Sequence, residues 1–325
     1  MAITFSNRFG RGGITRLAKT VISFKKIIST SNGSSTTAGD YTVVTYTGST
    51  STTLTLDSGS GTPPAGKSPG SGRESTIGAN VSPASFDVLV VGGGMPGQGG
   101  HANGGHGGGA VEATVTLAST TPYPLTVGGG GATPSNYNGA QSSGNPSSGF
   151  SQTIPGAPSP SGSKPNYYGY SRGECKRGTA GSPSGPYTGR NIYHPTEGPV
   201  AGDPISGPSP NYGRRGGNGL YSEITGTGVY YGGGGGGAGG NGYETSQGGK
   251  GGFGGGGGGG TGPGGSGGQP GTPSGTYGSS TGPGGGGGAT NSGGGGGSGG
   301  IGFCGSTYCV GKAGGSGIII IRYLR

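Results

Sequence analysis

Side chains suited to contact a ligand gather in residues 167–243, where tyrosine and arginine stand among serine, glycine, proline and asparagine. Tyrosine brings a rigid amphipathic ring at low entropy cost, and small residues fit around it, as in the binding loops of antibodies. Such rings stack on sugars, and arginine pairs with phosphate or carboxylate groups. We therefore predict a set of receptor-binding residues here: Tyr167, Tyr168, Tyr170, Arg172, Tyr187, Arg190, Tyr193, Tyr212, Arg214 and Arg215. The alternative is that these side chains cover glycine-rich segments or a neighbouring subunit, because aromatic residues and arginine are enriched at any interface.

Other patterns that look like chemical sites fail on their context. Residues 92–97 match the dinucleotide-binding pattern G-x-G-x-x-G, but that site needs a helix at the pyrophosphate, and Pro96-Gly97 cannot begin one. The three histidines, His101, His106 and His194, have no carboxylate or cysteine at ligand spacing. No Ser/His/Asp arrangement, paired carboxylates or phosphate loop stands out, so we expect no cofactor, no metal ion and no enzyme activity.

The cysteines do not form a disulfide framework, because there are three of them and Cys175 is isolated. Cys304 and Cys309 would close a small loop if they were oxidised, but two buried free thiols are favoured in a protein made in a cytoplasm. No signal peptide is evident, and no run approaches the roughly 18 apolar residues of a membrane span.

The elements that must position the binding residues are unusual in composition. The chain has 94 glycines and 24 prolines among 325 residues, and only 26% of its residues are hydrophobic. Ordinary globular domains are about 45 to 50% apolar, so burial of side chains can organise only part of this molecule. Collagen is excluded, because glycine does not recur at every third position. The net charge of +9 favours acidic partners, although only 9% of the residues are charged.

The first of four predicted parts is a basic arm, residues 1–35, which has no acidic residue in its first thirty positions. Its apolar spacing suits a helix, whereas its β-branched residues from Thr20 onward suit a strand. A basic amphipathic segment coats a membrane or nucleic acid, or it docks on a partner subunit, which is the interpretation we prefer. The predicted attachment residues are Arg8, Arg11, Arg16, Leu17, Lys19, Val21 and Lys25.

The second part, residues 36–130, is predicted to be a β module that residues 316–325 complete. Runs at 41–47 and 52–56 predict a hairpin across Gly48-Ser49. The run 86–91 is apolar on both faces, as a central covered strand would be. Alternation in 111–117, with a return at 125–127, predicts a second hairpin with one solvent-facing side. Together with residues 318–323, these runs supply a small sheet or sandwich closed by the two ends of the chain.

The third and fourth parts are Tyr/Ser/Pro/Arg-rich loops at 131–231 and a glycine body at 232–315, with almost no strand or helix signal between 128 and 315. In a polyglycine-II-type helix of three residues per turn, every backbone N–H and C=O points outward. Several such helices can approach closely and satisfy one another's groups. We expect rods of this kind at 92–109, 232–242, 248–260 and 284–300; the alternative is a flexible linker. The predicted fold is mainly β plus irregular structure, with very little α-helix.

The order of these parts resembles the glycine-rich domain of virion proteins of tailed bacteriophages, especially tail-fibre and receptor-binding proteins. The resemblance covers about residues 40–325 and rests on FDVLVVGGG at 86–94, VEATVTL at 111–117, TPYPLTVGGG at 121–130, Tyr230-Tyr231, and GSGIIIIRY at 315–323. It implies a phage structural protein in which polyglycine-type helices form a bundle and variable loops touch the host surface. The first thirty residues have no counterpart in it.

We expect a tail-fibre or tail-tip adhesin, located in the virion as a homo-oligomer or in many copies. Its expected partners are other tail or capsid subunits and a bacterial surface polysaccharide or outer-membrane receptor. The alternative is a head decoration or capsid fibre protein, whose basic arm would lie on capsid subunits. An RNA-binding glycine-rich protein fits the net charge but would need dense Arg-Gly-Gly repeats and aromatic RNP strands, so we expect no specific nucleic acid.

Overall fold

The computed structural model describes residues 27–29, 33–48, 51–56, 84–99, 104–117, 122–135, 142–157, 187–192, 213, 215–239, 247–260, 284–300 and 310–324. This part of the chain is built from β-strands and irregular segments and contains no helix, which confirms the prediction of a mainly β protein. The same residues hold no helix long and apolar enough to cross a membrane. The predicted attachment residues between Arg8 and Lys25 lie outside the described ranges.

The larger sheet has six strands, and each is antiparallel to its neighbours. In spatial order they are β10 (Tyr187–Ile192), β6 (Ala110–Leu117), β5 (Ala84–Val91), β13 (Ile318–Leu324), β3 (Tyr41–Tyr46) and β2 (Gly33–Ala38). The C-terminal strand β13 lies inside this sheet, where Ile320 is opposite Leu89 of β5 and Thr45 of β3. The last strand of the chain thus joins two strands from its first third.

A second sheet has five strands, and it corrects both predicted hairpins. Its order is β1 (Ile27–Ser29), β4 (Ser51–Leu56), β7 (Tyr123–Thr126), β8 (Ser147–Gly149) and β9 (Gln152–Ile154). The strands predicted at 41–47 and 52–56 both exist, but β3 and β4 lie in different sheets, and so do β6 and β7. Each short connection therefore crosses between sheets instead of closing a hairpin. Crossing lets consecutive strands bury their apolar sides in one shared core.

That core draws side chains from both sheets. Val44, Phe86 and Ile319 from the six-stranded sheet join Leu54 and Leu125 from the five-stranded sheet in a single cluster of buried side chains. Leu54 and Leu125 are fully buried, at 0% exposure. Burying a leucine or phenylalanine side chain contributes about 1.5 to 3 kcal/mol, so this cluster is a main source of stability.

The opposite face of the six-stranded sheet is covered by a small hairpin. Its strands are β11 (Leu220–Ser222) and β12 (Val229–Tyr231), and its buried residues Leu220, Ile224 and Tyr231 pack against a second cluster that includes Leu89 and Ile320. Strand β5 therefore buries side chains on both of its faces, as its continuous apolar run predicts.

Strands β8 to β12 correct the expectation of almost no strand between 128 and 315. All but β10 are three residues long, and the six-residue β10 carries a glycine and an arginine, so none of them has the apolar alternation that identifies a strand from sequence. Longer strands offer partners to two of them, because β10 pairs with β6 and β8 pairs with β7, whereas β9 pairs with β8 and β11 with β12. Tertiary context here outweighs local propensity.

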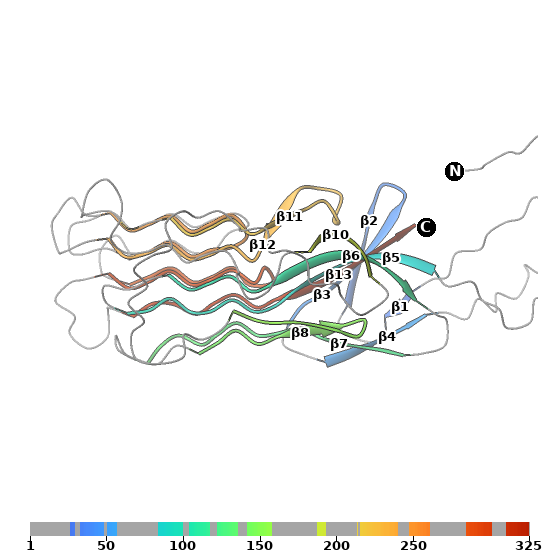
Figure 1. The fold of residues 1–325 in the computed structure, drawn as a ribbon, viewed down its shortest axis with the longest axis horizontal. Coiled ribbons are helices and arrows are strands. Elements are labelled where there is room, and N and C mark those ends of the chain that lie inside the picture. The colour runs from blue at the N-terminus through green and yellow to red at the C-terminus, as the bar shows by residue number, and fades with distance from the viewer. Residues whose placement is uncertain are drawn as a thin grey trace, which may run out of the picture.

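Most glycine-rich segments continue directly from a strand. Residues 92–99 follow β5, 104–109 precede β6, 232–239 follow β12, and 310–317 precede β13. Figure 1 shows these segments running side by side away from the sheets as wavy ribbons. The pairing of the strands thus fixes the position at which each glycine segment enters the body.

Backbone hydrogen bonds join the glycine segments to one another with a spacing of three residues. One set of donors and acceptors is Gly213 to Gln247, Gly216 to Lys250 and Gly219 to Phe253, at 2.8, 2.8 and 2.7 Å. Another set is Gly233 to Gly254, Gly236 to Gly257 and Gly239 to Gly260, at 2.8, 2.8 and 3.0 Å. In the described part of the body, backbone groups therefore make the contacts that side chains make in an ordinary core.

Candidate functional site

The structure describes few of the predicted receptor-binding residues. Tyr187 and Arg190 lie in the edge strand β10, and Arg215 lies just before β11. The others lie outside the described residues: Tyr167, Tyr168, Tyr170, Arg172, Tyr193, Tyr212 and Arg214. His101, His194 and all three cysteines also lie outside them. Arg215 is therefore the one predicted residue from which a described surface site can be built.

Arg215 is exposed and stacks on an aromatic ring that is far away in sequence. Its guanidinium carbon lies 4.6 Å from the centroid of the Phe253 ring. Its Nη2 donates a hydrogen bond of 2.8 Å to Oδ1 of Asn218, and the same oxygen accepts the Phe253 N–H at 3.1 Å. Asn218 thus holds the arginine and the phenylalanine together, and a cation above a ring gains about 0.5 to 1 kcal/mol at an exposed position.

Two tyrosines extend this contact into a row. The Phe253 ring lies 5.4 Å from Tyr230 at an interplanar angle of 34°, and Tyr230 lies 5.1 Å from Tyr221 at 61°. Tyr221 Oη donates a hydrogen bond of 2.9 Å to Oε1 of Glu223. We call the five residues Arg215, Phe253, Tyr230, Tyr221 and Glu223 the aromatic strip. Phe253 is 39% exposed and Tyr221 47% exposed, so the rings face solvent.

The local sequence explains why these rings point outward. In β11 the side chains alternate, with Leu220 and Ser222 buried and Tyr221 exposed. Tyr221 is directly opposite Tyr230 in β12, and such cross-strand aromatic pairs stabilise a two-stranded ribbon. Phe253 reaches the same place because its carbonyl accepts the N–H of Gly219, one residue before β11. A backbone contact within the glycine body therefore sets the third ring beside the other two.

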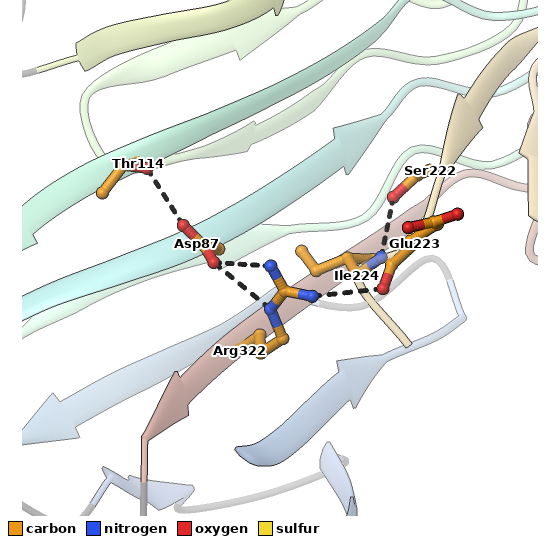
Figure 2. A network of polar contacts seen from close by, with 6 residues as sticks. All are labelled: Asp87, Thr114, Ser222, Glu223, Ile224 and Arg322. Atoms are coloured by element: carbon orange, nitrogen blue, oxygen red, sulfur yellow. Dashed lines mark hydrogen bonds and ion pairs between the residues drawn. The ribbon is translucent and has the colours of Figure 1, made fainter. Parts of the chain in front are cut away.

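A polar network fixes the hairpin that carries the strip to the six-stranded sheet. Figure 2 shows Arg322 of β13 between Asp87 of β5 and the loop after β11. Its Nη2 and Nε donate to Oδ2 of Asp87 at 2.7 and 3.2 Å, and its Nη1 donates to the carbonyl oxygen of Glu223 at 3.1 Å. Thr114 of β6 donates to Oδ1 of Asp87 at 3.0 Å. Arg322 thus ties the backbone of a strip residue to three strands of the sheet.

Among the residues that the structure describes, three titratable side chains have shifted pKa values. The hydrogen bond to Glu223 raises the pKa of Tyr221, and the negative charge of Glu223 and some loss of hydration act in the same direction. Burial, with a smaller contribution from Glu112, raises the pKa of Tyr231 to about 12. Burial lowers the pKa of His106 below its usual 6.5. Tyr221 of the strip therefore presents a neutral phenol near neutral pH.

The side chains of the aromatic strip are suited to non-covalent binding of a ligand. Three aromatic rings lie between a guanidinium and a carboxylate, so the surface combines apolar faces with one group of each charge. In the described part of the chain, no group of three or more His, Cys, Asp or Glu side chains is placed to hold a metal ion. Contact through ring faces and hydrogen bonds is what this arrangement supports.

The receptor-binding residues predicted from sequence include Arg215 but not the other members of the strip, which are Tyr221, Glu223, Tyr230 and Phe253. The available signal was the pair of short runs at 220–222 and 229–231, each with one outward tyrosine, separated by a turn at Gly226. Gly226 has a φ of +87°, which glycine adopts without strain. Nothing in the sequence around Phe253 indicates its partners.

These features define a β-rich protein with a body of glycine segments joined through their backbones. The chain belongs to the glycine-rich domain family, whose model matches residues 74–324. The match includes β5, β6, the hairpin β11–β12 and β13, and hence every residue of the aromatic strip. No curated protein and no solved structure matches the chain.

Proposed function

We propose that this protein is a structural component of a tailed-bacteriophage virion, placed at a tail fibre or tail tip, where it presents residues for recognition of the host surface. The observation that carries the proposal is the row of Phe253, Tyr230 and Tyr221, whose two outer rings are exposed, on a body that is rich in glycine and poor in charge. A row of rings held on a rigid scaffold suits adhesion, because little conformational entropy is lost on binding. The resemblance of the chain to phage virion proteins supports the same assignment.

We further propose that the glycine segments are polyglycine-II helices. Donors at Gly213, Gly216 and Gly219 recur at every third residue, which is the number of residues per turn of this helix. Neighbours on several sides are also expected of such helices: Gly257 donates to Gly295, and its carbonyl accepts from Gly236. The two sheets would form a sandwich around their shared core, with the first and last parts of the chain closing it.

Adsorption of virions tests the adhesin proposal. In the parent phage, the double variant Tyr221→Ala/Phe253→Ala should assemble into virions that adsorb poorly to host cells. The triple variant Tyr167→Ala/Tyr168→Ala/Arg172→Ala should lower adsorption as well, because it removes part of the predicted receptor-binding set. Lys250→Ala, which changes an exposed side chain of the body, is the matched control. Normal adsorption of both multiple variants would contradict the proposal.

Labelling of the protein on intact virions separates the tail from the head. Signal at the tail is expected, with the basic arm bound to neighbouring virion subunits through Arg8, Arg11, Arg16, Leu17, Lys19, Val21 and Lys25. Signal over the head would favour the second candidate, a head decoration or capsid fibre protein, whose basic arm lies on capsid subunits. In either case the protein is located in the virion, as a homo-oligomer or in many copies.

A further inference from the structure

We propose that the aromatic strip binds an uncharged saccharide chain, whose sugar rings stack on Tyr221, Tyr230 and Phe253. This inference deepens the proposed function and rests on it only for the source of the saccharide, a bacterial surface. The site itself is inferred from the geometry of the strip. It lies at the junction of the hairpin β11–β12 and the glycine body.

The three rings lie next to one another at interplanar angles of 34° and 61°, and two of them are exposed. Successive centroids are 5.4 and 5.1 Å apart, and the two outer rings, Phe253 and Tyr221, are the more exposed. The C–H faces of a pyranose ring are apolar, while its hydroxyl groups point outward around the ring. A row of ring faces with hydrogen-bonding groups at its edges is complementary to such a chain.

The polar groups at the two ends of the row favour an uncharged ligand. Arg215 stacks on Phe253 at one end, and the Glu223 carboxylate accepts from Tyr221 at the other. A guanidinium has five N–H donors, of which the bond to Asn218 uses one, and a carboxylate has several acceptor positions. Sugar hydroxyl groups can accept hydrogen bonds from the guanidinium of Arg215 and donate hydrogen bonds to the carboxylate of Glu223. An anionic chain that spanned the row would gain from Arg215 but lose through repulsion by Glu223.

The strip is too small for the apolar core of a stable protein interface. The exposed large hydrophobic residues of the described chain are Tyr41, Tyr221 and Phe253, and Tyr41 lies beneath the guanidinium of Arg322, 4.9 Å from it. A stable protein partner covers about 800 Å² on each side around a largely apolar centre. The residues that flank the strip in sequence, at 216–219 and 254–260, are all glycine except Asn218. A few rings in such surroundings fit a narrow ligand.

The strip is also held in place before any ligand arrives. Tyr221 and Tyr230 are fixed by the strand register, and Phe253 is fixed through Asn218 and Gly219. Arg322 anchors the Glu223 backbone to Asp87 of the sheet (Figure 2). Binding therefore orders few side chains, which favours affinity for a ligand that offers only weak individual contacts.

Binding of defined oligosaccharides to the purified full-length chain tests the inference. The probes are linear hexasaccharides of glucose, mannose and galactose, with a hexameric polyuronate as the acidic comparison, and the measurement is a calorimetric titration. We expect at least one neutral probe to bind more tightly than the polyuronate. Tyr221→Ala/Phe253→Ala should weaken that binding by about tenfold or more, as loss of aromatic anchors does. Tyr221→Phe keeps the ring and should weaken it less, and Lys250→Ala, which lies outside the strip, should bind as the unaltered chain does.

Several outcomes would overturn the inference. Binding of none of the neutral probes, or tighter binding of the polyuronate, contradicts it. Undiminished binding by the double variant places the saccharide elsewhere. A fall in oligomeric state of the double variant in sedimentation would show that the strip joins copies of the chain. The inference and the adhesin proposal can fail separately. If virions carrying the double variant fail to adsorb while the purified chain binds no neutral probe, the inference fails and the adhesin proposal stands. If the purified chain binds a neutral probe through the strip but virions carrying the double variant adsorb normally, the inference stands and the adhesin proposal fails.

Discussion

Gly257 bonds through its backbone to two other segments of the glycine body. Its N–H donates to the carbonyl of Gly295 at 2.9 Å, and its own carbonyl accepts the N–H of Gly236 at 2.8 Å. A Cβ atom at this position would press on the carbonyl oxygen of Gly286 and lie 2.7 Å from its carbonyl carbon. Gly257→Ala therefore adds one methyl group at a place where the neighbouring atoms belong to backbone.

The cost of this substitution follows from the geometry. Ordinary contact begins at 3.4 Å, so the separation of 2.7 Å from the carbonyl carbon alone requires a displacement of about 0.7 Å, and the nearer carbonyl oxygen requires more. The N–H of Gly286 bonds to Gly258 at 2.7 Å, and an equal displacement would carry this bond past the usual range of about 3.2 Å. Overpacking costs about 1 to 3 kcal/mol, and each buried group left without its partner costs a similar amount. We expect Gly257→Ala to lower the free energy of unfolding by about 2 to 4 kcal/mol.

Thermal and denaturant unfolding, followed by circular dichroism, measures this loss against two controls. Gly39 has a φ of +59° and nothing within 4 Å of an added Cβ, so Gly39→Ala costs only the left-handed backbone strain of about 1 to 2 kcal/mol. Lys250→Ala changes an exposed side chain and should alter stability by less than about 0.5 kcal/mol. A loss for Gly257→Ala no larger than that for Lys250→Ala would refute the packing argument.

Three further predictions concern charges and protons. Asp87→Asn removes the partly exposed ion pair with Arg322 and should lower the free energy of unfolding by about 1 kcal/mol, measured with denaturant. An unchanged midpoint would show that the network in Figure 2 does not stabilise the fold. Burial raises the pKa of Tyr231 from 10.0 to about 12, so the unfolded chain loses the phenol proton at a lower pH than the folded chain does. The free energy of unfolding should therefore fall between about pH 10 and 12, and Tyr231→Phe should remove this part of the alkaline loss. Burial lowers the pKa of His106, so as the pH falls through 6.5 the unfolded chain binds a proton on this imidazole before the folded chain does. The free energy of unfolding should therefore decline below about pH 6.5. The same decline in a His106→Gln variant would show that another group causes it.

The strands could be predicted from sequence where they carry a pattern. The apolar run at 86–91 and the β-branched runs at 41–47 and 318–323 all form strands, because residues that suit a half-buried or buried sheet recur there over six or more positions. Their partners could not be predicted in the same way. The hairpin rule assumes that neighbours in sequence pair, whereas β3 and β4 gain more by burying Val44 and Leu54 from opposite sheets in one core.

The site was predictable only in part, for a related reason. Composition between residues 167 and 243 indicated a binding region and included Arg215. The contact of Arg215 with Phe253 depends on which glycine segments lie side by side. A glycine run has no side chains to specify its register, so the register comes from the strands that the segments continue and from the three-residue spacing of their hydrogen bonds.

Amide hydrogen exchange measured residue by residue by NMR tests most directly whether backbone hydrogen bonds hold the glycine body together. The informative amides are those of Gly236, Gly257 and Gly295, which donate to other segments at 2.8, 2.9 and 2.8 Å, and Ile320 in the centre of the six-stranded sheet is the internal reference. We expect the glycine amides to be protected nearly as strongly as Ile320, because they open only when the body unfolds. Exchange of all three at the rate of an unstructured peptide, while Ile320 stays protected, would contradict the account.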